Sequence, residues 1–239
     1  MKNRFKEYKY TITTDPEDLN AAAGIPEELY RQMYDLHKRA LKGGKKNIEK
    51  LTRYIRQYPG VPQLKNFLSV AWMKTGNIEK AREINRYIVQ EHPDYLFGRL
   101  NLAFEYYDKE QYEKIPEVVG EMMEIQELYP DRDCFHLSEV IGFYRLAIMY
   151  FCAIGNLEAA ESRYEILREI APSHPDTEEV YPYIMKAYLK AGLKRMEEEN
   201  KTRISVKTVK HNKVIQRETK PDFINREIDW LYENGLRIE

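Results

Sequence analysis

Four side chains between residues 131 and 139 are of the types that bind metal ions. They are Asp131, Asp133, His136 and Glu139. Carboxylate and imidazole groups suit divalent metals, and in a helix His136 and Glu139, three positions apart, lie on one face. One alternative is therefore a metal-dependent or enzymatic domain centred on this segment. We favour another interpretation, in which Asp131 and Asp133 are N-cap and first-turn residues of a following helix.

Other motifs with catalytic chemistry are absent from the sequence. It contains no HExxH, no Gly-rich phosphate loop and no GxSxG. Its two cysteines, Cys134 and Cys152, form no CxxC pair, so we expect neither a zinc site nor a disulfide framework. We therefore expect a protein that is not an enzyme and that has no catalytic residues, no bound metal and no cofactor.

A basic segment at residues 201–220 suggests a second alternative, contact with nucleic acid. Seven Lys or Arg residues stand there against one acid, Glu218, and such a ribbon could meet phosphates. No aromatic residue lies between the basic ones to stack on bases. The formal net charge of −1 also gives no global attraction to polyanions. We favour a solvated β-hairpin, in which His211 and Asn212 form the turn between the apolar residues Ile204, Val206, Val209, Val214 and Ile215.

The elements that would carry these segments repeat along the chain. A short phrase occurs at residues 47–51 and 77–81, with looser copies at 111–115 and 156–160. Each copy lies one helix length before a proline, and these are Pro59, Pro93, Pro130 and Pro172. The pattern predicts a unit made of a helix, a tight turn, a second helix and a proline-marked break.

The register of the repeats is kept by small residues followed by large aromatic ones. Ser69 and Trp72 map onto Ala103 and Tyr106 at a spacing of 34. A third copy, Ala147 with Tyr150, follows after 44 residues, with the extra ten around 129–138. Small residues at these positions let two helices approach closely, while the aromatic ring fills the space one turn on. Gly76 and Gly155 suit the turns between helices.

These residues resemble the tetratricopeptide repeat family, in degenerate copies. The resemblance covers residues 61–172 clearly and 27–59 more weakly. Three first-helix positions depart from the family pattern, and they hold Lys65, Arg99 and Phe143. The resemblance implies an all-α fold, an α-solenoid of antiparallel helix pairs in which the first helices line a concave groove. A long end helix is expected after Asp176, which would cap it.

The groove implied by the resemblance would be apolar on two successive helices. Its expected lining is Phe97, Leu100, Phe104, Tyr107, Ile141, Tyr144, Ile148 and Phe151. Such a patch is larger than a soluble monomer usually exposes, so something should cover it. Three occupants stay open: a partner peptide, a second copy giving a homo-oligomer, or an autoinhibitory last helix from Asp222 to Leu236. Some family members clamp a peptide carboxylate, and Asn101 and Arg145 fall at equivalent places, although the clamp lysines are absent.

The expected organisation has three parts. Residues 1–20 form an N-terminal extension with a strand at Tyr8, Tyr10 and Ile12, residues 21–200 the repeat domain, and 201–239 the hairpin and final helix. No signal peptide and no run of about 20 apolar residues is recognised, so we expect a cytoplasmic protein without a membrane contact. The function expected is a scaffold that binds a protein or peptide through the concave groove.

Overall fold

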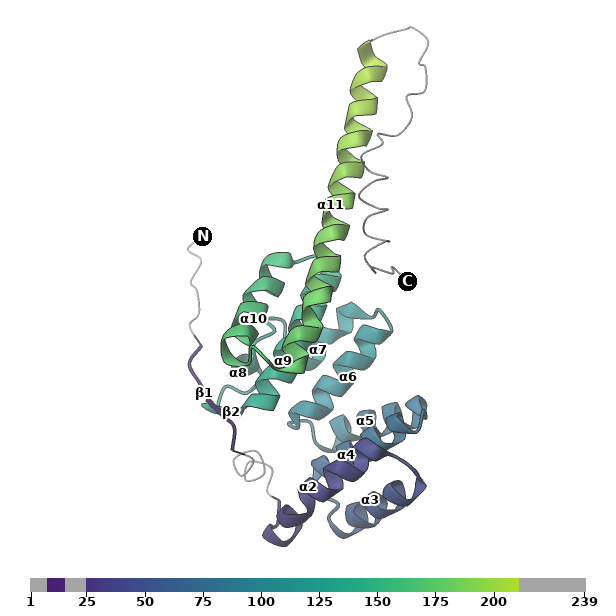
Figure 1. Ribbon diagram of the computed structural model, residues 1–239, viewed down its shortest axis with the longest axis vertical. Helices are drawn as coiled ribbons and strands as arrows, with labels where there is room; N and C mark the ends of the chain where they lie inside the picture. The colour runs from purple at the N-terminus through teal and green to yellow at the C-terminus, as the bar shows by residue number, and fades with distance from the viewer. Residues whose placement is uncertain (1–7, 16–24, 211–239) are drawn as a thin grey trace. The chain divides into compact units, whose positions relative to one another are not determined.

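The computed structural model describes residues 8–15 and 25–210, with side chains to Lys201. These residues are mostly helical, as predicted (Figure 1). The long helices are α2 (Glu27–Lys42), α3 (Lys45–Gln57), α4 (Pro62–Lys74), α5 (Ile78–Glu91), α6 (Leu96–Asp108), α9 (Leu137–Ile154), α10 (Leu157–Ile170) and α11 (Pro175–Lys210).

Two of the predicted turns have the backbone that their residues favour. Gly76 and Gly155 both have φ of +80°, a conformation that glycine adopts without a steric penalty. After each glycine an asparagine side chain caps the next helix: Asn77 accepts from the Lys80 N–H, and Asn156 accepts from the Ala159 N–H. The repeated phrase thus encodes a helix start as well as a turn.

The N-terminal core lies among α2, α3 and α4. Its buried residues are Leu29, Met33, Leu36, Ala40, Leu51, Val61, Leu64 and Ala71. On α4, Ser69 is buried and its hydroxyl donates to the Ala81 carbonyl of α5 at 3.2 Å. This contact brings together two of the small residues that the repeat pattern predicted at a close helix approach.

The C-terminal core is larger and is centred on α9, which packs against α6, α10 and both short strands. By length and composition α9 is apolar enough to cross a membrane, with mean hydropathy 1.5, a segment that the sequence analysis overlooked. In the structure 56% of the helix is buried by other parts of the molecule. A helix that is apolar all round and enclosed in this way is typical of a protein core.

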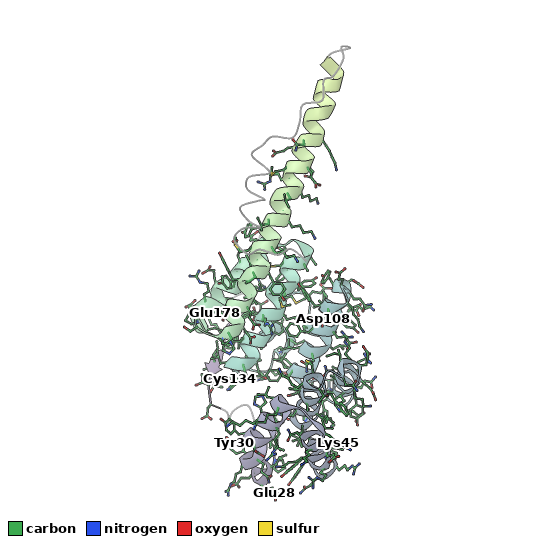
Figure 2. All side chains as sticks on the ribbon, turned by 45° about the vertical axis from the view of Figure 1, so that its right-hand side comes forward. Glu28, Tyr30, Lys45, Asp108, Cys134 and Glu178 are labelled. Atoms are coloured by element: carbon green, nitrogen blue, oxygen red, sulfur yellow. The ribbon has the colours of Figure 1, made fainter. Side chains whose placement is uncertain are left out.

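The segment between α6 and α9 differs from a regular helix pair. It contains a 3₁₀ turn (Tyr112–Lys114), α7 (Ile115–Val119), α8 (Ile125–Leu128) and β2 (Cys134–His136). Gly120 and Met123, with φ of +86° and +49°, take the chain out of the helical region and end α7 early. We call residues 120–136 the insert. Figure 2 labels Cys134 at the start of β2 and Glu178 on α11.

A strand is present in the N-terminal extension, and of the predicted strand residues it includes Ile12, while Tyr8 and Tyr10 precede it. β1 (Thr11–Thr13) pairs in parallel with β2, and Ile12 lies opposite Phe135 (Figure 1). The first strand of the predicted hairpin is wrong, because its residues Ile204, Val206 and Val209 belong to the helix α11. The predicted turn at His211 and Asn212, the strand residues Val214 and Ile215, and the final helix from Asp222 to Leu236 lie outside the described residues.

The chain divides into two compact units, Met1–Gly192 and Leu193–Glu239. The first holds both cores and the insert. Of the second unit the structure describes the continuation of α11 to Lys210. All sites discussed below lie in the first unit.

Candidate functional site

Five of the predicted groove residues are buried in the C-terminal core. They are Leu100, Ile141, Tyr144, Ile148 and Phe151. A cover over these residues was expected, and other parts of the chain supply it, because α9 is enclosed on both of its apolar sides. These five residues therefore do not line an accessible groove. Tyr144 is an example of a residue that the insert covers. Its hydroxyl lies 2.9 and 3.0 Å from the two carboxylate oxygens of Glu124, a residue of the insert.

The other predicted groove residues are half-buried, and the two polar ones already have partners. Phe97, Phe104 and Tyr107 keep part of their surface exposed. Asn101 donates to the Asn66 side-chain oxygen at 2.8 Å. Arg145 forms ion pairs with two acidic residues of α11, Asp176 at 3.4 Å and Glu179 at 3.0 Å, and lies over the Phe104 ring. The structure therefore does not bring Asn101 and Arg145 together as a carboxylate clamp.

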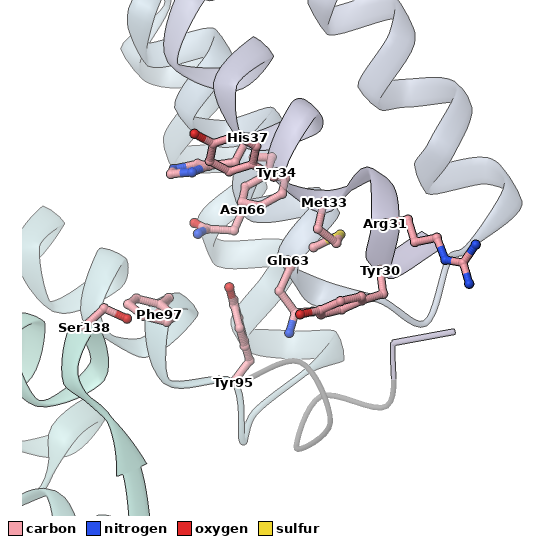
Figure 3. A pocket seen from close by; sticks show the side chains of 11 residues that line it. Tyr30, Arg31, Met33, Tyr34, His37, Gln63, Asn66, Tyr95, Phe97 and Ser138 are labelled. Carbon is pink, nitrogen blue, oxygen red and sulfur yellow. The ribbon is translucent and has the colours of Figure 1, made fainter. Parts of the chain in front are cut away.

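A cavity with a volume of about 640 Å³ lies elsewhere, between α2, α4 and α6. We call it the aromatic cavity. Figure 3 shows that Arg31 points away from the other labelled side chains. Of the predicted groove residues, Phe97 is in its wall, and so are Gln63 and Asn66, which precede Phe97 and Leu100 by the repeat spacing of 34 residues. The full lining is Tyr30, Arg31, Met33, Tyr34, His37, Gln63, Asn66, Phe67, Tyr95, Phe97 and Ser138.

The helices position these side chains through their core-facing residues. On α2, Leu29, Met33 and Leu36 are buried against α4 and fix the rotation of the helix. Tyr30 and Tyr34 are four positions apart and lie one step round the helix from that core face. On α4, the ring of Phe67 stacks on His37 at 5.2 Å between centroids. The cavity wall is thus formed by neighbours of core residues, which gives it a rigid support.

The polar groups of the cavity are mainly neutral amides and hydroxyls. Gln63 is 7% exposed, and its side-chain oxygen has no hydrogen-bond partner. Asn66 accepts from Asn101 and also hydrogen-bonds the Tyr95 hydroxyl. Burial raises the pKa of Tyr95, so this hydroxyl stays protonated at neutral pH. A buried acceptor without a partner costs free energy, which is the condition that a ligand N–H or O–H would relieve.

The residues proposed as metal ligands are used for structure. His136 caps α9, and the Glu139 carboxylate accepts from the His136 N–H at 3.0 Å, which completes a capping box. Arg132 donates to both oxygens of Glu139 at 3.1 and 2.8 Å. The expectation that Asp131 and Asp133 cap this helix was wrong, since α9 begins at Leu137 with His136 as its N-cap and Glu139 as the acid of its first turn. Across residues 8–15 and 25–210, no three His, Cys, Asp or Glu side chains are grouped to hold a metal.

The basic segment is described in part. Lys201, Arg203, Lys207 and Lys210 stand on α11, so the first half of this segment is helical. Cys134 and Cys152 are both free thiols, and burial raises the pKa of Cys152 to about 11. That thiol is therefore held in its unreactive, protonated form.

Most residues of the aromatic cavity were not predicted from the sequence. The apolar spacing of Leu29, Met33, Leu36 and Ala40 marks the core face of α2, whereas the aromatic residues beside that face carry no such signal. The available signal was the i, i+4 pair Tyr30 and Tyr34, two aromatic rings beside an already complete core face. Tyr95 precedes α6 in the chain, and no periodicity could have placed it.

Comparisons with known proteins identify no relative of this chain. No family model matches it. No curated protein and no solved structure matches it either.

Proposed function

We propose that the chain is a helical-repeat scaffold that binds a segment of a partner protein in the aromatic cavity. The observation that carries this proposal is the combination of several aromatic rings from three separate helices with the unpaired side-chain oxygen of Gln63. A cavity of about 640 Å³ is within the range of known ligand sites, which is roughly 300–1,000 Å³. It is large enough for one or two large side chains of a peptide.

The energetics favour an apolar anchor with a polar backbone contact. Each large apolar side chain that the rings cover would contribute about 1.5–3 kcal/mol. A peptide N–H donating to the Gln63 oxygen would add about 0.5–1.5 kcal/mol and remove an unsatisfied buried group. The lining has no carboxylate and no lysine among its described residues, and its exposed charge, Arg31, forms an ion pair with Glu27 at 3.0 Å. A mainly uncharged, aromatic or aliphatic segment is the class of ligand that fits.

A tetratricopeptide-like solenoid is part of the same proposal. Three contacts support it, because α2 packs against α4, α4 against α6, and α6 against α9. Those are the first helices of the four units that the repeat pattern defines. In such an array the first helices form the concave, ligand-binding side, and the aromatic cavity is lined mainly by α2, α4 and α6.

The proposal can be tested with a pair of matched substitutions. Tyr34 is 70% exposed at the cavity, and Tyr181 is 49% exposed on α11, outside the cavity. Peptides are first selected from a displayed random library against the wild-type protein, and their Kd values are measured by fluorescence anisotropy. We expect Tyr34→Glu to weaken binding at least about tenfold, the equivalent of about 1.4 kcal/mol, and Tyr181→Glu to leave it within about twofold.

Two results would count against the proposal. One is an equal loss of peptide affinity in both variants, which would mean that the peptides do not bind specifically in the aromatic cavity. The other is a library that yields no binder while sedimentation shows a concentration-dependent dimer that Tyr34→Glu abolishes. In that case the cavity is an interface between two copies of the chain.

A further inference from the structure

The N-terminal segment is held on the insert by more than strand pairing. β1 and β2 are three residues long, and the Thr11 N–H donates to the Asp133 carbonyl at 2.8 Å. Two short strands alone are marginally stable in water. The side chains around them must therefore supply most of the interaction between segments that lie over 100 residues apart.

One side chain of the insert binds the peptide backbone itself. The Gln126 side-chain oxygen accepts from the Lys9 N–H at 3.1 Å, and its amide nitrogen donates to the Lys9 carbonyl at 3.0 Å. The side chain of Gln126, on α8, thus makes the pair of hydrogen bonds with Lys9 that the backbone of a neighbouring strand would make. This recognition is independent of sequence, because it uses only main-chain atoms of the bound segment.

Tyr10 is recognised by its ring and by its hydroxyl. The ring packs edge-on against buried Phe135, at 5.1 Å between centroids. The hydroxyl lies 3.0 Å from that of Tyr144, which in turn is bonded to the carboxylate of Glu124. Glu124 and Tyr144 are both buried, at 6% and 2% exposure.

The direction of these hydrogen bonds follows from counting protons. Tyr144 has one hydroxyl proton, and an ionised Glu124 can only accept, so Tyr144 donates to Glu124. The Tyr144 oxygen must then accept from Tyr10. A phenylalanine at this place in the bound segment would leave that oxygen without a donor, so the position selects tyrosine. Ile12, two residues on, packs against the C-terminal core and selects an apolar residue.

We infer that this surface of the insert is a recognition site for an extended peptide with the pattern Tyr-x-Ile, filled in cis by residues 8–15. The surface is made by Glu124, Gln126, Phe135 and Tyr144, and it is separate from the aromatic cavity. Main-chain bonds along one edge, with pockets for alternate side chains, are how folded domains bind an added strand. A partner with the same pattern competes with a covalently attached segment, and covalent attachment raises the effective concentration of that segment at the site.

The test uses the full chain and a fluorescein-labelled peptide that copies residues 8–15. Tyr10→Ala removes the ring contact with Phe135 and the hydroxyl contact with Tyr144. Thr11→Pro removes the N–H that donates to the Asp133 carbonyl. Both substitutions leave the residues of the insert unchanged. By fluorescence anisotropy we expect both variants to bind the peptide at least about tenfold more tightly than the wild type, whose own segment competes. A peptide with phenylalanine in place of the second tyrosine should bind about tenfold more weakly, and one with the same residues in scrambled order should not bind.

Folding of the variants decides the remaining outcomes. If circular dichroism shows native helix content but neither variant takes up the peptide, the surface is no peptide site and the inference fails. It also fails if the scrambled peptide binds as well as the copy. Loss of fold in both variants would mean that residues 8–15 are an integral part of the core, and that no partner replaces them.

Discussion

The N-terminal and C-terminal regions each hold a buried polar side chain, Gln63 in one and Tyr144 in the other, and these two side chains differ in their hydrogen-bond partners. In the C-terminal core, the buried Tyr144 hydroxyl has partners on both sides, Glu124 and Tyr10. At the edge of the N-terminal core, the buried Gln63 oxygen has none, and the Gln63 side chain is part of the lining of a cavity of about 640 Å³. The insert and the N-terminal segment thus supply the partners of Tyr144, whereas in our proposal a ligand supplies the partner of Gln63.

The largest expected difference between the two regions concerns aromatic packing. Phe135 is fully buried between Tyr10 and the C-terminal core, so Phe135→Ala should lower the free energy of unfolding by about 3–5 kcal/mol. Phe67, in the cavity wall, is half-buried, and Phe67→Ala should cost about 1–2 kcal/mol. Guanidinium unfolding followed by circular dichroism measures both. Equal losses would contradict the distinction between a completed core and an open wall.

The next difference concerns pH. Burial raises the pKa of Glu124, so the folded state takes up a proton more readily there than the unfolded state does. This group's contribution to stability is therefore greatest below the unfolded pKa of about 4.3 and is lost as the pH rises through the raised folded value. Glu124→Gln should remove that slope, by up to about 1.4 kcal/mol for each unit of pKa difference. Urea unfolding between pH 4.5 and 8 measures it.

The N-terminal region contains a buried group whose contribution to stability changes with pH in the opposite direction. Burial lowers the pKa of Lys65, so its contribution increases as the pH rises through the lowered value toward about 10.4. Lys65→Met should flatten the alkaline side of the stability profile, above the range in which His92, which Lys65 contacts, changes its charge. If both variants altered the same side, the two buried groups would not distinguish the regions.

How much could be predicted from the sequence follows from the range of each interaction. Helix positions and turns depend on local spacing, and Gly76, Gly155 and the small residue Ser69 indicated them correctly. The buried state of Tyr144 depends on Glu124 and on Tyr10, 134 residues away, a contact that no periodicity encodes. For the same reason β1 was predicted as a strand, but its partner β2 was not.

The candidate site divides in the same way. Phe97 was predicted because it shares a helix with the repeat pattern, whereas the cavity as a whole needs side chains from α2, α4 and α6 to meet. The repeat pattern predicted which face of each helix packs against its neighbour. It did not predict which of the other faces is covered by a further segment of the chain. That choice depends on the insert, whose sequence has no repeat to compare it with.

The smallest predicted effect compares two glutamines. Gln63 has a buried oxygen without a partner, so Gln63→Leu should raise the free energy of unfolding by about 1 kcal/mol while weakening peptide binding in the aromatic cavity. The Gln126 side chain hydrogen-bonds both the N–H and the carbonyl of Lys9. Gln126→Leu should therefore lower the free energy of unfolding by about 1 kcal/mol and leave peptide binding in the aromatic cavity unchanged. Chemical unfolding and the anisotropy assay measure the two quantities on the same samples.

The sign of the Gln63 result is the informative part. A gain in stability with a loss of binding means that the folded chain carries an unsatisfied group that its ligand would pair. A loss of stability would show instead that water in the cavity already pairs this oxygen and that leucine displaces it without replacing the hydrogen bond. Gln63 would then be as fully paired as Tyr144, and the two side chains would differ only in whether water or protein groups pair them.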